Sequence, residues 1–479
     1  MVILYMTNLN ITLNRANSIP LQVQLISALK DHIATVSTLD DVRLPSSRSL
    51  AIDLNVSRIV TLTAYEQLIA EGYLISKPGS GTYINQEIFQ TVPPSQPTEN
   101  DYRGPDWFNS PPVQENHIQY DVDFTIGRPS NALFDEAAWK RSWRHALSHR
   151  FSNEPPPPEG IFPLRQAIAE LVVRNRGIRC VADDIIITSG AVDIITLMAR
   201  LTAPFNPISC LENPGFPAAW EIFNRYGHDI RPVTLAPDGL RVSDLPVTSD
   251  RAKLLFCTPS HQFPLGYRLP LSKRLSVLDW AVQHDAIILE DDYDSEFRYD
   301  VASIPSLKAQ DSSGHVIYFS SLSKSLSPAI RLGYMIAPQK IRSAVMIEID
   351  KNHMQPTGLL QRAMAHFIQK GELDKHIRRM RRLYGTLNAA MRDGLAPLSP
   401  KIRISGLEAG LHCALTIPSD IDIPVLQKKL KKKAIKCSPL DQYSFATTPV
   451  AGLALGYGHL TEQEITSGLA ILCNVIKDY

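Results

Sequence analysis

A run of apolar residues that ends in a lysine-bearing turn constrains the fold of this chain more than any other feature. Residues 316–320 (VIYFS) form a β-type segment, and the serine-rich turn that follows contains Lys324. A second apolar run, residues 286–289, ends in the acidic cluster EDDYD at residues 290–294. Because ligands lie beyond the carboxyl ends of strands in parallel α/β sheets, we expect lysine, acid and phenol to meet at one edge of a sheet.

The side chains expected at that edge indicate a particular chemistry. The amine of Lys324 can form a Schiff base with an aldehyde cofactor. The carboxylate of Asp291 suits a protonated ring nitrogen, and the phenol of Tyr293 suits a ring hydroxyl. The set therefore predicts pyridoxal phosphate as the cofactor, and a lysine in a solvated surface loop is the plainer alternative.

Bulk properties exclude several classes of protein. A length of 479 residues exceeds one ordinary core, so two or more domains are expected. The net charge of +1 gives no overall attraction to nucleic acid or to a membrane. Six cysteines without a CxxC pair indicate neither a metal site nor a disulfide framework, so a cytoplasmic protein with reduced thiols is the simplest interpretation. Neither a signal peptide nor a membrane-spanning stretch is expected.

A proline-rich segment divides the chain. Residues 86–122 hold six prolines among polar residues and are predicted to be an extended linker. Before it, residues 17–85 show three helical segments and then a strand, a glycine turn and a strand, the pattern of a winged helix–turn–helix. After it, residues 123–479 alternate strands (184–188, 253–257) with helices (192–201, 271–284), which predicts an α/β domain with a mainly parallel sheet. A mixed terminal lobe is expected from about residue 375.

Four residues of the first module are candidate DNA contacts. Arg48 and Arg58 stand at the starts of two helices, where a guanidinium group can reach phosphates or guanine edges. Ser57 is placed to bind a phosphate, and Gly81 lets the tip of the wing approach the duplex. Residues 1–85 carry six basic and six acidic side chains, so binding depends on local placement and dimerisation. A helical interaction module that binds no DNA is the alternative.

The first module resembles the winged helix–turn–helix of GntR-type regulators. The motifs that carry the resemblance are RLPSSRSLA (43–51), VSR (56–58), AYEQL (64–68), AEGYL (70–74) and GSGTY (79–83). The family often has x-Thr-Val after the arginine, whereas here Ile59 and Val60 precede Thr61. The resemblance makes Thr61 a further candidate DNA contact, displaced by one position along the helix.

The region beyond the linker resembles fold-type I aminotransferases, and in particular the MocR subfamily of regulators. The motifs are GRP (127–129), TSGA (188–191), ENPGFP (212–217), TPSHQFP (258–264), EDDYDSEFRY (290–299) and SLSK (321–324). The resemblance implies a large α/β domain with a small C-terminal α+β lobe. It also implies a homodimer, because fold-type I sites are built between two subunits, and it allows the DNA-binding domain to be swapped onto the partner.

The same resemblance implies a set of cofactor contacts around Lys324. The candidates are the phosphate donors Ser189, Gly190, Ala191, Ser321, Ser323 and Arg331, the stacking aromatic Phe216, and Gln262 or His261 near the ring hydroxyl. Free amides at a helix start and a guanidinium group are the usual ligands of a phosphate. A core position is the alternative for the aromatic.

Two absences separate the chain from aminotransferases of α-amino acids. Such enzymes bind the substrate carboxylate with an arginine in the C-terminal lobe, but no arginine follows Arg403. Four prolines, residues 155–158, occupy the stretch where relatives place a tyrosine. We therefore predict a regulator that binds an operator in double-stranded DNA and senses pyridoxal phosphate or a small amine-type effector, in vitamin B6 or amine metabolism. The alternative is an active aminotransferase with an appended helix–turn–helix domain.

Overall fold

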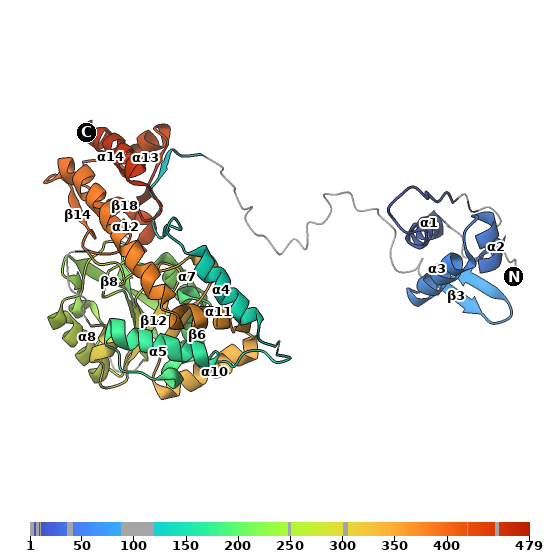
Figure 1. Cartoon of the computed structure of the whole chain (residues 1–479), viewed down its shortest axis with the longest axis horizontal. Helices are drawn as coiled ribbons and strands as arrows, with labels where there is room; N and C mark the ends of the chain where they lie inside the picture. Colours follow the sequence, from blue (N-terminus) through green and yellow to red (C-terminus); the bar gives the residue numbers. More distant parts are fainter. Residues whose placement is uncertain are drawn as a thin grey trace. The chain divides into compact units, whose positions relative to one another are not determined.

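The chain forms two compact units, residues 1–115 and residues 116–479, whose elements are drawn in Figure 1. The computed structural model describes residues 4–5, 9, 11–35, 42–87, 119–150, 152–247, 251–299, 305–418, 420–445 and 450–479. Most of the predicted linker lies outside these ranges. Its last residue, Val122, begins a strand of the second unit.

The first unit is a three-helix module with a small sheet. Its elements are α1 (Leu21–Thr35), α2 (Ser47–Asp53), α3 (Arg58–Ala70), β1 (Leu4–Tyr5), β2 (Val42–Arg43), β3 (Leu74–Lys77) and β4 (Gly81–Ile84). The sheet order is β1-β2-β4-β3, and the antiparallel pair β3–β4 is the predicted wing. Ser46 caps α2 by accepting a hydrogen bond from the amide of Ser49 at 3.1 Å. The core includes Leu25, Leu29 and Leu68 from two of the helices.

An eight-stranded sheet forms the centre of the second unit. Its order is β6 (Ile185–Thr188), β13 (Gly333–Ile336), β12 (Val316–Ser321), β11 (Ile287–Asp291), β10 (Lys253–Cys257), β7 (Ile208–Asn213), β8 (Asp229–Ala236) and β9 (Gly239–Leu240). The five central strands from β12 to β8 pair in parallel, and β13 runs antiparallel to both of its neighbours. The pairing of Asp291 with Phe319 brings the acidic cluster and the lysine turn to one edge.

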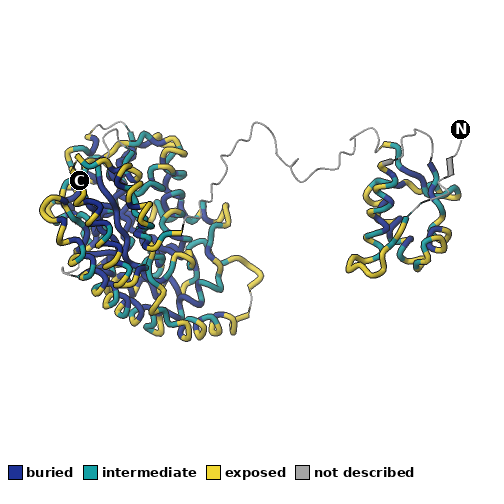
Figure 2. The backbone as a smooth tube through the Cα atoms, turned by 90° about the horizontal axis from the view of Figure 1, so that it is seen from above, coloured by how far each residue is buried: buried dark blue, intermediate teal, exposed yellow. Residues whose placement is uncertain are grey.

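Helices cover both faces of this sheet. They are α4 (Glu136–Leu147), α5 (Phe162–Arg176), α6 (Ala191–Thr202), α7 (Pro217–Arg225), α8 (Leu271–Gln283), α9 (Leu307–Gln310), α10 (Gln339–Asn352), α11 (Gly358–Gln369) and α12 (Glu372–Leu395). Successive strand residues point to opposite faces, so Leu254 packs with α6 and its neighbour Leu255 packs with α8. Figure 2 shows the buried strands inside a shell of half-exposed helices.

The C-terminal lobe has its own sheet. The order is β14 (Arg403–Ser405), β15 (His412–Thr416), β18 (Gly452–Gly456) and β17 (Ser438–Pro439), with α13 (Ile423–Lys432) and α14 (Glu462–Lys477) beside it. The short strand β16 (Ile435–Lys436) pairs in parallel with β5 (Val122–Asp123), the first strand of the second unit.

Among the helices of the described ranges, none combines the length and the apolar character that a bilayer crossing requires.

Candidate functional site

A cavity of about 220 Å³ lies at the carboxyl ends of β11 and β12. Residues from segments far apart in the sequence line it, and they include these predicted residues: Ala191, Phe216, Asp291, Tyr293, Ser321, Ser323, Lys324 and Arg331. The fold therefore brings the lysine, the acid, the phenol and four of the six expected phosphate donors into one space. The lining does not include three other predicted residues, Ser189, Gly190 and Gln262.

Lys324 lies in the turn after β12 with its amine in the cavity. Its Nζ donates a hydrogen bond to the carbonyl oxygen of Gly127 at 2.5 Å. Burial lowers the pKa of Lys324, although the charges of Asp294 and Asp291 act in the opposite direction. A lowered pKa favours the neutral amine, which is the form that attacks an aldehyde. Gly127 has a φ of +88°, and a Cβ there would lie 3.0 Å from Nζ, so a glycine permits this close approach.

Asp291 ends β11 and presents its carboxylate to the cavity. Its Oδ1 atom is buried and has no hydrogen-bond partner among the described residues. Burial raises the pKa of Asp291 well above its usual range, and the charges of Asp292 and Asp294 raise it further. A protonated ring nitrogen would supply both the missing hydrogen-bond donor and the missing positive charge. The acid therefore fits a pyridine cofactor.

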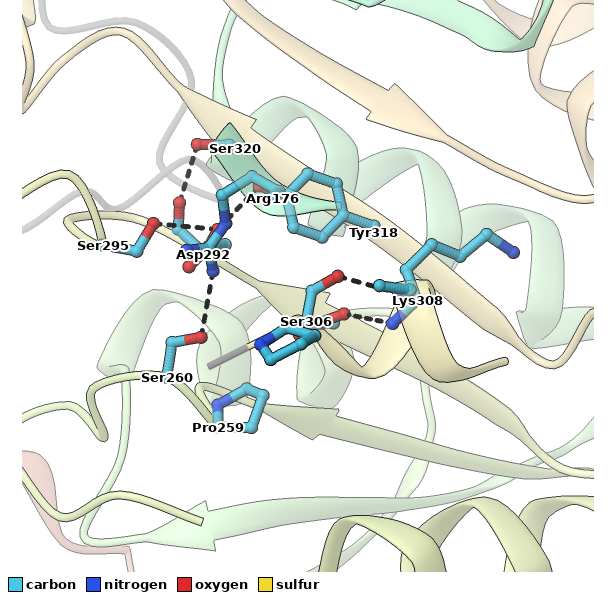
Figure 3. A network of polar contacts seen from close by, with 12 residues as sticks. Arg176, Pro259, Ser260, Asp292, Ser295, Ser306, Lys308, Tyr318 and Ser320 are labelled. Atoms are coloured by element: carbon cyan, nitrogen blue, oxygen red, sulfur yellow. Dashed lines mark hydrogen bonds and ion pairs between the residues drawn. The ribbon is translucent and has the colours of Figure 1, made fainter. Parts of the chain in front are cut away.

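The next residue, Asp292, belongs to a buried polar network with Arg176 and Tyr318 (Figure 3). Its Oδ2 lies 2.6 Å from Nε of Arg176 and accepts a 2.6 Å hydrogen bond from the hydroxyl of Tyr318. Arg176 also donates to Oγ of Ser260 at 3.1 Å. Asp291 lines the cavity whereas Asp292, the residue that follows the end of β11, is held in this network, so the two adjacent carboxylates have different surroundings.

Tyr293 belongs to a second polar group, shared with two histidines. Its hydroxyl lies 3.2 Å from Nδ1 of His261, and the same nitrogen lies 2.9 Å from Oδ2 of Asp294. His412, from the start of β15, completes the group, and the ligating atoms of the two histidines and Asp294 lie within 4.8 Å of one another. Burial and the neighbouring His261 lower the pKa of His412 to about 3, so its ring is neutral at ordinary pH.

The position expected for Gln262 is corrected by the structure. Its side chain is 2% exposed and holds the surrounding loop instead of facing the cavity. The amide nitrogen donates to the carbonyl of Pro214 at 3.0 Å, and the amide oxygen accepts from the backbone of Leu265 at 3.1 Å. With both ends used by backbone groups, Gln262 is a structural residue of this loop.

The residues expected to contact a phosphate at the start of α6 differ in position. Some lie at or near the cavity, whereas the amide of Ser189 is already hydrogen-bonded within the protein. Ala191 lines the cavity, and Arg331 lies near the helix start, with Nη1 3.9 Å from the Cβ position of Gly190. Gly190 precedes the helix with a φ of +119°, where a side chain is strained. The amide of Ser189, in contrast, donates to Oδ2 of Asp193 at 3.0 Å. That amide is therefore not free for a ligand in this structure.

Sequence reasoning missed part of the cavity wall. The unforeseen lining residues are Gly127, Val192, Thr258, Phe263, Asp294, Pro328, Leu411 and His412. Gly127 and Asp294 stand inside motifs that were recognised, so the signal for them existed. His412 had none, because only the packing of the C-terminal lobe brings it to the cavity. No arginine from beyond Arg403 is available to line this wall, since the sequence has none.

On the first unit, three of the predicted DNA contacts are exposed. Arg48 lies in the first turn of α2, and Ser57 and Arg58 lie at the start of α3. Ser57 is the N-cap residue of α3 but makes no side-chain capping bond, so its hydroxyl remains available. Ile59, which was not predicted, is 74% exposed beside Arg58. An aliphatic side chain at this position can contact a thymine methyl group in a major groove.

Thr61 is corrected by the structure. It is fully buried, and its hydroxyl donates to the carbonyls of Ser47 at 2.8 Å and Arg58 at 3.0 Å. The hydroxyl therefore joins α2 to α3 and does not face a duplex. Gly81 has a φ of +127°, and a Cβ there would lie 2.7 Å from Nε of Arg43. The backbone conformation and the contact with Arg43 explain why this position holds a glycine, so contact with a DNA duplex is not needed to explain it.

Comparisons with known proteins match both units. The family described as "Bacterial regulatory proteins, gntR family" matches residues 21–84, and "Aminotransferase class I and II" matches residues 121–449. An archaeal alanine:glyoxylate aminotransferase superposes with a TM-score of 0.70 at 22% identity, over 76% of this chain and 92% of that one. The kynurenine aminotransferase of Pyrococcus horikoshii gives 0.69 at 24% identity, with the same coverage. The predicted fold class is confirmed.

Relatives with the same two-part architecture extend over nearly the whole chain. An uncharacterized HTH-type transcriptional regulator, YdeL of Bacillus subtilis, is 32% identical, with 95% of this chain and 97% of the relative covered. The probable rhizopine catabolism regulatory protein MocR of Rhizobium meliloti is 31% identical, with 96% and 94% covered. The pyridoxine biosynthesis transcriptional regulator PdxR of Corynebacterium glutamicum is 30% identical, with 98% and 99% covered. The chain therefore belongs to the GntR family of bacterial transcriptional regulators, in the MocR-type branch that carries an aminotransferase-like domain.

Proposed function

We propose that this regulator binds pyridoxal phosphate covalently through Lys324 and couples that site to DNA binding by residues 17–85. The observation that carries the proposal is the cavity itself. A half-buried lysine and a buried carboxylate line the same cavity, and Oδ1 of that carboxylate, Asp291, has no partner in the described chain. Both groups would gain from a pyridine aldehyde, since the amine can bond to the aldehyde carbon and the carboxylate can accept a hydrogen bond from the protonated ring nitrogen.

The remaining wall residues supply what the cofactor needs. Arg331, Ser321 and Ser323 are donors for a phosphate, and Phe216 offers an aromatic face to the ring. When bound, the cofactor supplies an electron-poor ring and an aldehyde that exchanges between amines. Tyr293 would hold a hydroxyl proton for the ring hydroxyl of the cofactor, and its contact with His261 orients the phenol.

A regulatory role, with little or no transamination, is favoured by the missing carboxylate clamp. An α-amino acid needs a guanidinium group from the C-terminal lobe, but the sequence has no arginine beyond Arg403, and no described arginine of that lobe lines the cofactor cavity. We therefore propose pyridoxal phosphate itself as the signal, in control of vitamin B6 metabolism. The relative named as a pyridoxine biosynthesis regulator supports this choice. An amine effector is the second candidate, because one relative is named as a rhizopine catabolism regulator.

DNA binding is proposed for the exposed face of α2 and α3, which presents Arg48, Ser57 and Arg58. Residues 1–85, with six basic and six acidic side chains, give little long-range attraction, so we propose that a cytoplasmic homodimer joins two such modules on one operator. Cofactor or effector binding would then shift the dimer between arrangements of different DNA affinity.

The cofactor part of the proposal is tested by visible absorbance. The purified chain, mixed with pyridoxal phosphate, should develop the absorbance band of a protein-bound imine, and borohydride should fix the cofactor to Lys324 in a peptide map. Lys324→Ala is the matched variant and should remain colourless. A wild-type chain that stays colourless, or a label on another lysine, contradicts the assignment.

The DNA part is tested by gel shifts on the DNA upstream of the protein's own gene. Arg48→Ala and Arg58→Ala should each lower affinity by about tenfold, because each removes a guanidinium contact of about 1–3 kcal/mol. Arg225→Ala, an exposed arginine of the second unit, is the charge-matched control and should leave affinity unchanged. Binding that is insensitive to salt and to both substitutions would argue that the module binds no DNA.

The alternative activity, aminotransfer, has one observation in its favour. The cavity keeps the lysine, acid and phenol in a fold shared with aminotransferases. Incubation with amino donors decides between the two functions. Sustained formation of keto acid with many turnovers would identify an enzyme, whereas at most a single half-reaction is expected of a regulator.

A further inference from the structure

A second and larger cavity, of about 590 Å³, opens between the α/β domain and the C-terminal lobe. Its walls come from the loop around residues 260–268 and from residues 403–409, which lead from β14 towards β15. Among the described residues, none lines both this cavity and the cofactor pocket. The two spaces are therefore separate.

Three arginines give the second cavity its character. Arg268, Arg298 and Arg403 line it, and no ion pair joins the exposed Arg268 or Arg403 to a carboxylate within the described ranges. Burial and the charge of Arg176 lower the pKa of Arg298, whereas the charges of Asp292 and Asp294 raise it. The positive charges of Arg268 and Arg403, which no described carboxylate pairs with, attract an anion.

The acids of this cavity do not cancel those charges. Asp238 lies 2.7 Å from Nζ of Lys273, so a further cation already pairs with it. Glu408 is exposed at the rim. The lining therefore keeps an excess of positive charge.

Arg298 also lacks hydrogen-bond acceptors. Its Nη2 donates to the carbonyl of Ser260 at 3.2 Å, but Nε and Nη1 are buried without a partner in the part of the chain that the structure describes. A guanidinium group carries five hydrogen-bond donors in a rigid fork, and buried donors that make no hydrogen bond are unfavourable. A carboxylate or a phosphate is the group whose geometry matches this fork.

Apolar walls accompany the cations. Tyr267, Pro270 and Ile404 line the same space, so an occupant meets both a charged end and an apolar side. We propose that this cavity is a second small-molecule site, which binds an organic anion through the arginines while the cofactor occupies its own pocket. Carboxylate and phosphate share the required chemistry.

His261 connects the two sites. It lines the second cavity, and a Cβ on Gly266, another lining residue, would lie 3.1 Å from its Nε2. Its Nδ1, on the other side of the ring, contacts Asp294 and Tyr293, which line the cofactor pocket. An anion beside this imidazole therefore alters the polar group around the cofactor. This coupling rests on the proposed function, whereas binding in the cavity does not.

The test is calorimetric titration of the full chain with succinate and, separately, with inorganic phosphate, at constant ionic strength. Each titration is run with and without saturating pyridoxal phosphate, and visible absorbance before the anion is added reports whether the cofactor is bound. The variant Arg268→Ala/Arg403→Ala removes two exposed arginines of the cavity, and Arg225→Ala is the charge control. Equal thermal unfolding of the variants shows that each one folds.

We expect saturable binding of at least one anion in the presence of the cofactor, weakened at least about tenfold by the double substitution. The control should bind like the wild type, and the anion that binds identifies the chemical class. A shift of the cofactor absorbance on saturation would reveal the coupling through His261.

Three results overturn the proposal: no saturable binding of either anion, binding that the double substitution leaves unchanged, or binding that the cofactor abolishes. The last result would place the anion in the phosphate cradle of the cofactor pocket. A chain that binds an anion but no cofactor would refute the proposed function alone.

Discussion

The pKa of the cofactor lysine determines how capture of the aldehyde varies with pH. Burial lowers the pKa of Lys324, so its neutral amine persists to lower pH than that of an ordinary lysine. We expect the rate of cofactor incorporation to rise with pH. This rate should reach its plateau at a lower pH than the rate at which free Nα-acetyl-lysine reacts with the cofactor. Stopped-flow absorbance of the cofactor-free chain measures this rate. Identical profiles for the protein and the free amine would contradict the burial argument.

The buried carboxyl group of Glu212 should make the free energy of unfolding depend on pH. Burial raises its pKa to about 7 from an ordinary value of 4.5, although hydrogen bonds from Thr258 oppose the shift. The folded form therefore holds more protons than the unfolded form in this interval. The contribution of the group to the free energy of unfolding is complete below about pH 4.5 and is lost as the pH rises through 7.

Glu212→Gln removes this titration. The stability of the variant relative to the wild type should improve as the pH rises from 4.5 to 7, measured by denaturant unfolding across that range. Glu66→Gln, at an exposed position of α3, is the matched control. A relative stability that stays constant with pH would show that Glu212 does not titrate in this interval.

Among the elements, the contact between α2 and α3 depends on the buried hydroxyl of Thr61. Thr61→Val should lower the stability of the first unit by about 1–2 kcal/mol, because two backbone carbonyls lose their donor. Thr63→Val is the control, since that hydroxyl donates only within α3, to Ile59 at 2.8 Å. Thermal unfolding of the first unit measures both changes. Equal effects of the two substitutions would contradict the inter-helix role.

The end of β11 depends on the buried pair of Arg176 and Asp292. Asp292→Asn leaves a buried guanidinium group without its counter-charge and should destabilise the second unit by about 3–5 kcal/mol. It should also weaken retention of the cofactor, because Asp291 loses its anchored neighbour. Glu136→Gln, which breaks an exposed pair with Lys140, is the control and should have no measurable effect. Urea unfolding and cofactor release provide the two readouts.

The elements that sequence predicts best are buried strands. The runs at 184–188 and 253–257 correspond to β6 and β10, because strands covered on both faces are continuous apolar runs that turn residues delimit. The loop position of Gln262 had no such signal, since two backbone groups from a folded loop determine it. For Thr61 the signal existed and was overlooked. Residues 61, 64, 65 and 68 follow the spacing of a buried helix face.

At the scale of the whole molecule, every residue that lines the cofactor pocket comes from the second unit. We therefore expect a fragment of residues 116–479 to bind pyridoxal phosphate with the affinity of the full chain. Absorbance titration measures both proteins, and the fragment with Lys324→Ala is the control. A fragment that folds but binds much more weakly would show that the first unit contributes to the pocket.

The pairing of β5 with β16 joins the beginning of the second unit to the C-terminal lobe. The backbone amide of Asp121 donates to the carbonyl of Ala434 at 2.9 Å, so the chain that arrives from the DNA-binding module is first fastened to the C-terminal lobe. That same lobe supplies His412 to one cavity and Arg403 to the other. A movement of the lobe against the central sheet would consequently also displace Asp121 and β5, the point at which the second unit begins.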